Sequence, residues 1–123
     1  MNTIVTKKAP AAIGPYSQAV ETSNLIFVSG QLPVEPQTGV MEENIKKQTE
    51  QSLLNIQAIL SERNLSMEHI VKTTVFLQDL KDFADVNAIY SKFFGQTYPA
   101  RSCVEIARLP KDARVEIEAI AIK

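Results

Sequence analysis

Residues 114–122, Arg-Val-Glu-Ile-Glu-Ala-Ile-Ala-Ile, alternate in a way that limits the possible folds more than any other segment of this chain. Every second position is small or apolar, as on the buried face of a β-strand; these positions are Val115, Ile117, Ala119 and Ala121. The opposite face carries Arg114, Glu116, Glu118, Ile120 and Ile122, so it is not simply polar. We therefore expect one layer of structure over the first face and a separate cover for the two isoleucines.

Two amphipathic helices can supply the first layer. Residues 43–63 keep one helical face apolar, and Asn64 stands where a left-handed C-terminal cap is expected. The side chains of that face are Ile45, Thr49, Leu53, Ile56 and Leu60. A second helix is expected to begin at Asp82, as its N-cap, and to end at Gly95. Its apolar face comprises Phe83, Val86, Tyr90, Phe93 and Phe94.

The remaining periodic segments predict strands. Residues 25–29, 70–77, 101–106 and 114–122 are rich in β-branched or aromatic residues, and residues 4–6 and 18–22 are weaker candidates. Without a linker, a repeat or a shift in composition, residues 1–123 predict one domain. The order of elements predicts an α+β fold, with a six-stranded mixed sheet and two helices on one face.

Composition excludes several classes of function. The net charge of −1 provides no positive field for nucleic acid or an anionic membrane. One cysteine fits a reducing cytoplasm, and no apolar run has the length of a signal peptide or a membrane span. Cys103 and His69 alone cannot build a zinc site, so no metal is expected. Ile120 and Ile122 predict self-association, because a chain of 123 residues has no third layer to cover them.

Arg101 begins the segment Arg-Ser-Cys-Val-Glu-Ile and shares one strand face with Cys103 and Glu105. It can be a structural partner of one of three carboxylates, those of Glu105, Glu116 and Glu118. Alternatively, its planar guanidinium binds a substrate carboxylate, and a spare carboxylate orients a water molecule. Cys103 has no histidine close in sequence to activate it, which favours a packed and inert thiol over a nucleophile.

The segments PAAIGPYSQAV, FVSGQLPV, VKTTVFLQDLKDFADVNAIY and PARSCVEIARLPKDARVEIEAIAI together resemble the Rid (YjgF) family of reactive-intermediate deaminases. Because Arg101 is present, the chain resembles the arginine subgroup of that family in particular. The resemblance implies a chorismate-mutase-like fold and a homotrimer with active sites in clefts between subunits. It also implies hydrolysis of small 2-imino acids, made by pyridoxal-phosphate dehydratases, to 2-keto acids and ammonia. It implies no metal or cofactor.

The resemblance further assigns roles to individual residues. Arg101 would bind the substrate carboxylate, and Glu116 would position the attacking water. Backbone groups of Gly30 and Cys103 would contact the substrate, while side chains from three other segments would line the cleft; these are Tyr16, Ser29 and Asn87. Strand parity alone does not distinguish Glu116 from Glu118, and the loop of residues 95–98 is shorter than in some relatives.

The reaction needs no strong nucleophile, because an imine already hydrolyses in water. Fixing the carboxylate and presenting one oriented water are tasks of proximity and electrostatics. A trimeric module that binds a small regulatory ligand without turnover is the alternative function, since a fold does not determine an activity. The joint presence of Arg101 and Glu116 favours the enzyme.

Overall fold

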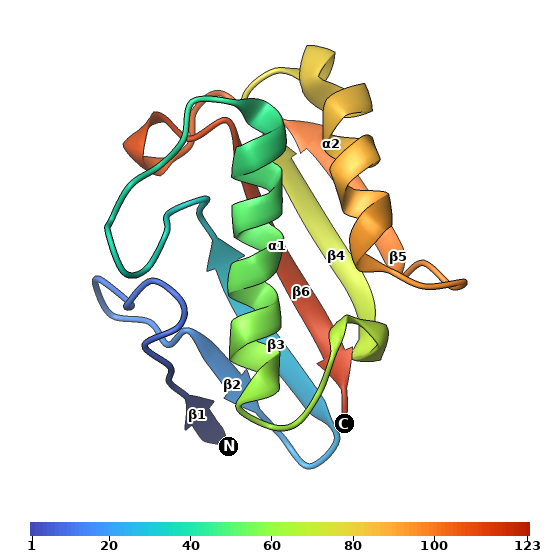
Figure 1. Ribbon diagram of the computed structural model, residues 1–123. Coiled ribbons are helices and arrows are strands. Elements are labelled where there is room, and N and C mark those ends of the chain that lie inside the picture. The colour runs from blue at the N-terminus through green and yellow to red at the C-terminus, as the bar shows by residue number, and fades with distance from the viewer.

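The computed structural model describes residues 1–123 and has two helices packed on one face of a six-stranded sheet (Figure 1). The strands are β1 (Asn2–Ile4), β2 (Ala19–Glu21), β3 (Leu25–Gln31), β4 (Ile70–Leu77), β5 (Ala100–Glu105) and β6 (Val115–Ile122). The helices are α1 (Ile45–Ser61) and α2 (Phe83–Tyr90), accompanied by the 3-10 turns η1 (Met67–His69), η2 (Leu80–Asp82), η3 (Ser91–Phe93) and η4 (Pro110–Asp112). The predicted α+β class is confirmed.

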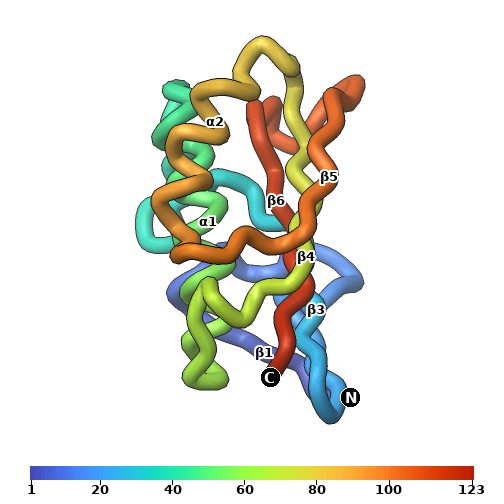
Figure 2. Tube along the Cα trace, turned by 90° about the vertical axis from the view of Figure 1, so that its right-hand side faces the viewer, coloured from blue at the N-terminus to red at the C-terminus, as the bar shows by residue number.

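The strands lie in the order β1-β2-β3-β6-β4-β5, so the last strand of the chain is central in the sheet. Only β4 and β5 are parallel, and all other neighbouring strands are antiparallel. The alternation of β6 therefore has the predicted result: Val115, Ile117 and the two alanines are at most 1% exposed beneath the helices. Figure 2 shows both helices on one side of the sheet and no helix on the other.

Helix α1 follows the predicted periodicity but is two residues shorter at each end than residues 43–63. The Oδ1 atom of Asn44 accepts the backbone N–H of Lys47, so the N-cap stands just before Ile45. Leu53, Ile56 and Leu60 are fully buried against the sheet. Asn64 has a φ of 59°, the left-handed conformation that the sequence predicted after this helix.

The second helix begins where expected, with Asp82 at the N-cap position, but the expected capping hydrogen bond and the expected end at Gly95 are wrong. Asp82 precedes α2, but its side chain caps no helical N–H group. Its two carboxylate oxygens instead accept hydrogen bonds from Nη2 of Arg114, at 2.8 and 2.9 Å. At the other end, the α-helix stops at Tyr90, and Phe94 is already extended before Gly95 is reached. Phe83, expected in the core, is 41% exposed.

The first strand also differs from the prediction, covering Asn2–Ile4 rather than residues 4–6. The buried side chain of Gln18 accepts the backbone N–H of Thr6 at 2.8 Å and donates to the carbonyl of Thr6 at 3.0 Å. Because a side chain satisfies these backbone groups, the strand ladder ends at Ile4. Strand β2 is shorter than predicted, whereas β3 extends beyond residue 29 to Gln31.

The face of the sheet opposite the helices is open in the single chain (Figure 2). Phe27 and Ile122 are 41% and 46% exposed on it, and Ile120 is half-buried. The expectation that β6 leaves isoleucines without an intramolecular cover is therefore confirmed. Neither of the two helices has the length and apolar character that a membrane span requires.

Candidate active site

Arg101 lies on the helix-facing side of the sheet. Its register partner on β4 is Thr73, and partners directly opposite in a ladder point to the same face. Thr73 is fully buried beneath α2, where its hydroxyl lies 2.7 Å from the Tyr90 hydroxyl. The Arg101 side chain therefore extends along the edge strand towards α2 and stays partly accessible to solvent.

Helix α2 holds the guanidinium of Arg101 without neutralising it. Nη1 of Arg101 donates to Oδ1 of Asn87 at 2.8 Å, and its Cζ atom lies over the rings of Phe83 and Tyr90. None of the four ion pairs in the protein includes Arg101. The hypothesis that Arg101 is a structural partner of Glu105, Glu116 or Glu118 is therefore wrong.

The hollow next to this guanidinium, named here the arginine hollow, has a volume of about 350 Å³. It is lined by Asn87, Tyr90, Ser91, Tyr98, Pro99 and Arg101. Tyr98 belongs to the short loop before β5, and its ring packs edge-on against Phe94 at a centroid distance of 6.3 Å. An unpaired cation in a hollow of this size can receive a small anion.

Glu116 points to the opposite face of the sheet. Its register partner is Phe76, whereas its neighbours Val115 and Ile117 are buried beneath the helices. A second hollow of about 650 Å³ opens beside it, named here the glutamate hollow. Four of the predicted site residues line this hollow, namely Tyr16, Ser29, Gly30 and Glu116, together with Glu118, Lys111 and other residues of the loop 10–16.

Gly30 is required beside Glu116 for space rather than for its backbone conformation. Its φ lies outside the left-handed region, which among the glycines only Gly14 and Gly39 occupy. A Cβ atom placed on Gly30 would lie 2.8 Å from Cδ and 2.9 Å from Oε1 of Glu116. The missing side chain therefore lets the Glu116 carboxylate rest against the backbone where the β3–β6 register shifts, between Val28 and Gln31.

Glu116 is half-buried, and its carboxylate forms no hydrogen bond and no ion pair within the chain. Burial raises the pKa of Glu116 above its ordinary value, and the nearby Glu118 carboxylate raises it further. Glu118 is exposed on the same strand face. The structure thus distinguishes the two glutamates, which strand parity could not do.

Tyr16 and Ser29 are both held by the turn that precedes β2. The Tyr16 hydroxyl accepts the backbone N–H of Ile13 at 3.3 Å, and Gly14 within the same turn has a φ of 130°. The Ser29 hydroxyl donates to the carbonyl of Ser17 at 2.6 Å. These contacts fix the polar rim of the glutamate hollow.

Cys103 follows Arg101 on the helix-facing side and is paired with the buried Val75. Its side chain packs partly buried against the hydrophobic core. Burial raises the pKa of the Cys103 thiol, and the charge of Arg101 only partly opposes this effect. The thiol is therefore protonated at neutral pH and is a poor nucleophile.

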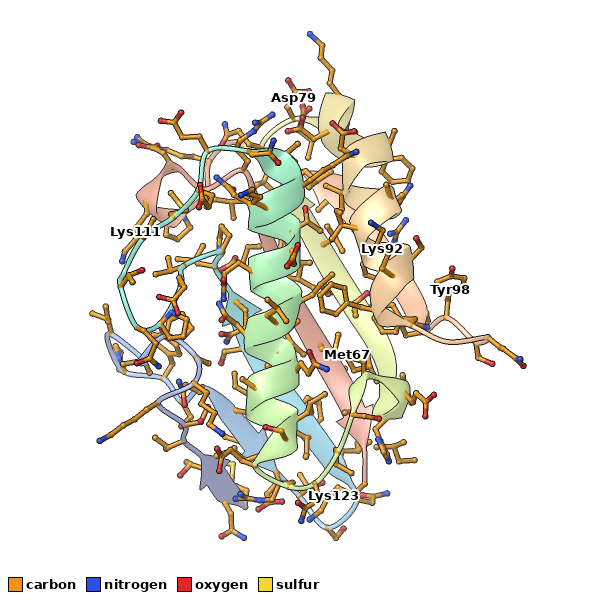
Figure 3. All side chains as sticks on the ribbon, in the orientation of Figure 1. Met67, Asp79, Lys92, Tyr98, Lys111 and Lys123 are labelled. Carbon is orange, nitrogen blue, oxygen red and sulfur yellow. The ribbon has the colours of Figure 1, made fainter.

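The predicted site residues fall into two groups that one chain does not bring together. Arg101 and Asn87 form the arginine hollow, with Cys103 on the same face, whereas Glu116 and its neighbours form the glutamate hollow on the other. The two hollows are also separated along the sheet, because Tyr98 of the first and Lys111 of the second lie at opposite lateral edges of the protein in Figure 3. No three His, Cys, Asp or Glu side chains gather where a metal ion could bind.

Comparison with known proteins assigns the chain to a family. A family model described as endoribonuclease L-PSP matches residues 6–123. The chain belongs to this family, the Rid (YjgF) proteins. Among Rid relatives, the 2-iminobutanoate/2-iminopropanoate deaminase of Salmonella typhimurium is 55% identical over 124 residues, covering 98% of this chain and 97% of that protein.

Solved structures agree with the Rid assignment over the full chain. The YjgF gene product of Escherichia coli has a TM-score of 0.97 at 54% identity, covering 100% of this chain and 99% of that one. E. coli TdcF with bound serine has a TM-score of 0.97 at 49% identity, with the same coverage.

Sequence reasoning missed several residues that line the two hollows or contact Arg101. Phe83 and Tyr90 were assigned to the core because they match a helical apolar stripe. Tyr90 does belong to the core, whereas Phe83 is exposed, and the contact of both rings with Arg101 was not foreseen. Tyr98 and Lys111, which line the two hollows, lie in loops without periodicity. The only available signal was the concentration of aromatic residues shortly before the Pro-Ala-Arg segment.

Proposed function

We propose that this Rid protein hydrolyses small 2-imino acids to 2-keto acids and ammonia. Water adds to the carbon of the C=N bond, and collapse of the adduct forms C=O and releases ammonia, so that one water molecule is consumed per substrate. The name of the Salmonella relative, which shares 55% of its residues over nearly the whole length, supports this reaction. No metal, cofactor or covalent intermediate is needed for the step.

The observation that carries the proposal is the unpaired state of two opposite charges. The Arg101 guanidinium has no carboxylate partner in the chain, and the Glu116 carboxylate has no cation or hydrogen-bond donor. A partly buried charge without a partner lowers the stability of the fold, and such charges are common at ligand-binding sites. Arg101 would bind the carboxylate of the substrate in a bidentate pair.

Glu116, rather than Glu118, would orient the attacking water. A half-buried carboxylate without a protein donor retains both oxygens for a water molecule, and its raised pKa makes it a better proton acceptor. Backbone groups near Gly30 and Cys103 would contact the reacting end of the substrate. Tyr16 and Ser29 would line the cleft beside Glu116, and Asn87 would line it beside Arg101.

A second copy of the chain would bring the two hollows together. They open on opposite faces of one sheet, so a carboxylate bound by Arg101 would meet the Glu116 of another subunit. The family resemblance implies a homotrimer, and the exposed Phe27, Ile120 and Ile122 offer an apolar surface for it. Small 2-imino acids and further copies of the chain would be the partners, without nucleic acid or membrane.

The proposal is tested by coupling the protein to a threonine dehydratase and measuring the rate of release of ammonia and 2-oxobutanoate. Arg101→Ala should reduce the enzyme-dependent rate at least about 100-fold, because it removes a charge-assisted bidentate pair of roughly 3 kcal/mol. Arg63→Ala is the matched control, since Arg63 is also partly exposed but pairs with Glu21 at 2.8 Å, outside both hollows. Full activity of Arg101→Ala would refute the proposal.

The binding module without turnover is the alternative function, and the structure of the relative E. coli TdcF with bound serine is the observation that favours it. The same assay separates the two functions. Ligand binding that depends on Arg101, without any acceleration of ammonia release, would identify a binding module.

A further inference from the structure

We propose that Phe83 and Tyr90 form an aromatic slot that positions the Arg101 guanidinium to receive a carboxylate. This inference rests on the proposed function and deepens it, because it assigns residues to the selection of a 2-imino acid over an uncharged imine. Phe83 and Tyr90 act through Arg101 and are therefore positioning residues.

The slot is built by one face of α2. Phe83, Asn87 and Tyr90 are separated by four and three residues, which places them side by side on a helix. The Cζ atom of Arg101 lies 5.5 Å from the ring centroid of Phe83 and 4.8 Å from that of Tyr90. Both distances are in the range of a cation–π contact, so the guanidinium is held by two rings and one amide oxygen.

Tyr90 has a fixed position from which to hold Arg101. It is 5% exposed, and its hydroxyl lies 2.7 Å from the hydroxyl of Thr73 on the neighbouring strand. The ring of Phe94 packs on it at a centroid distance of 4.7 Å. Few rotations are available to a ring that is buried and hydrogen-bonded in this way.

Phe83 gains little from its position except this contact. With 41% of its surface exposed, it is not a member of the hydrophobic core, although it lies on the helical stripe that otherwise forms the core. The exposed position of this phenylalanine is explained if its ring positions the Arg101 guanidinium.

The slot leaves the hydrogen-bonding edge of the guanidinium available. Aromatic rings attract a cation through their faces but accept no strong hydrogen bonds, and Asn87 binds only Nη1. Of the five N–H groups of an arginine, most therefore remain free for the two oxygens of a carboxylate. The two aromatic rings also hold the guanidinium without neutralising it, whereas a glutamate in their place would form an ion pair with it.

The experiment measures the binding of 2-oxobutanoate and of its uncharged amide by calorimetry, for the wild-type protein and four variants. Phe83→Leu removes the exposed ring, Tyr90→Phe keeps the buried ring, and Arg101→Ala removes the cation. The matched control is Phe93→Leu, because Phe93 packs against the core in the next turn and makes no contact with the guanidinium. Circular dichroism confirms that each variant folds.

Phe83→Leu should weaken binding of the keto acid by about 3- to 30-fold and leave binding of the amide unchanged. Tyr90→Phe keeps the ring but loses the hydrogen bond to Thr73, so it should lose less affinity than Phe83→Leu, and Phe93→Leu should bind like the wild type. Wild-type affinity of Phe83→Leu, together with a loss in Arg101→Ala, would overturn the slot and leave the proposed function intact. An equal loss for acid and amide in Phe83→Leu would also overturn it, whereas wild-type affinity of Arg101→Ala would refute the proposed function itself.

Discussion

Arg101 and Glu116 are surrounded by groups that fix their positions without neutralising their charges. Arg101 is held by an amide and two rings, and Glu116 rests against the bare backbone of Gly30. Cys103 lies close to Arg101 in sequence, but burial keeps its thiol protonated. At the scale of single residues, the proposed site therefore consists of an unpaired cation and an unpaired carboxylate, which suits a reaction that needs orientation more than a nucleophile.

Gly30→Ala should abolish most of the activity while leaving the fold intact. The added Cβ would overlap the carboxylate of Glu116 at 2.8 Å, and this carboxylate can move away because it ends a flexible side chain. The free energy of unfolding should change by less than about 1 kcal/mol, since Gly30 does not need a left-handed backbone. The coupled assay and urea denaturation measure the two effects.

Gly39→Ala is the control for this prediction, because Gly39 has open space around it and a positive φ of 74°. It should lose stability and keep its activity, the reverse of Gly30→Ala. Wild-type activity of Gly30→Ala would show that the position of Glu116 does not matter.

Glu118→Gln should move the acidic limb of the pH–rate profile to lower pH. Burial is the larger cause of the raised pKa of Glu116, and repulsion by the Glu118 carboxylate is the second. A water-orienting carboxylate is active when ionised, so activity falls as pH decreases through its pKa. Removing the charge of Glu118 lowers that pKa but keeps the part due to burial.

Rates are measured for the wild type, Glu118→Gln and the control Glu50→Gln, whose carboxylate is exposed on α1. An acidic limb at the same pH in all three proteins would contradict the assignment of Glu116.

At the scale of elements, the sequence predicts well what depends on local periodicity. The alternation in β6 gave the buried face of the central strand, and the stripe in α1 gave a helix within two residues of its bounds. The errors arise where distant side chains intervene. Arg114 binds Asp82 from 32 residues away, so the carboxylate predicted to cap a helix forms an ion pair instead. Gln18 binds the backbone of Thr6 from 12 residues away, so the residues predicted as a strand around Thr6 do not pair with another strand.

The same limit explains what was predicted of the candidate site. Arg101, Glu116 and Gly30 could be named from motifs that resemble a family, and the structure gives each a suitable environment. Which face of the sheet each occupies follows from the register of β4 with β5 and β6, which local patterns do not contain. Phe83 could not be recognised as a partner of Arg101, because a helical stripe does not reveal where the strand β5 begins relative to the helix.

At the scale of the whole molecule, one chain holds two hollows on opposite faces of its sheet, and one of these faces has no cover. Both facts have the same explanation in the proposed trimer, in which the open face of β3 and β6 would be buried and the arginine hollow of one subunit would meet the glutamate hollow of the next. Activity would then depend on assembly, although no single chain changes its fold.

Subunit mixing tests this central claim most directly. Arg101→Ala and Glu116→Ala should each be inactive, yet a sample unfolded and refolded as an equal mixture should recover about one quarter of the wild-type rate. This fraction follows from random assembly, because one interface in four then combines an intact arginine hollow with an intact glutamate hollow. A mixture as inactive as its two components, with wild-type protein recovering fully from the same refolding, would contradict a site shared between subunits.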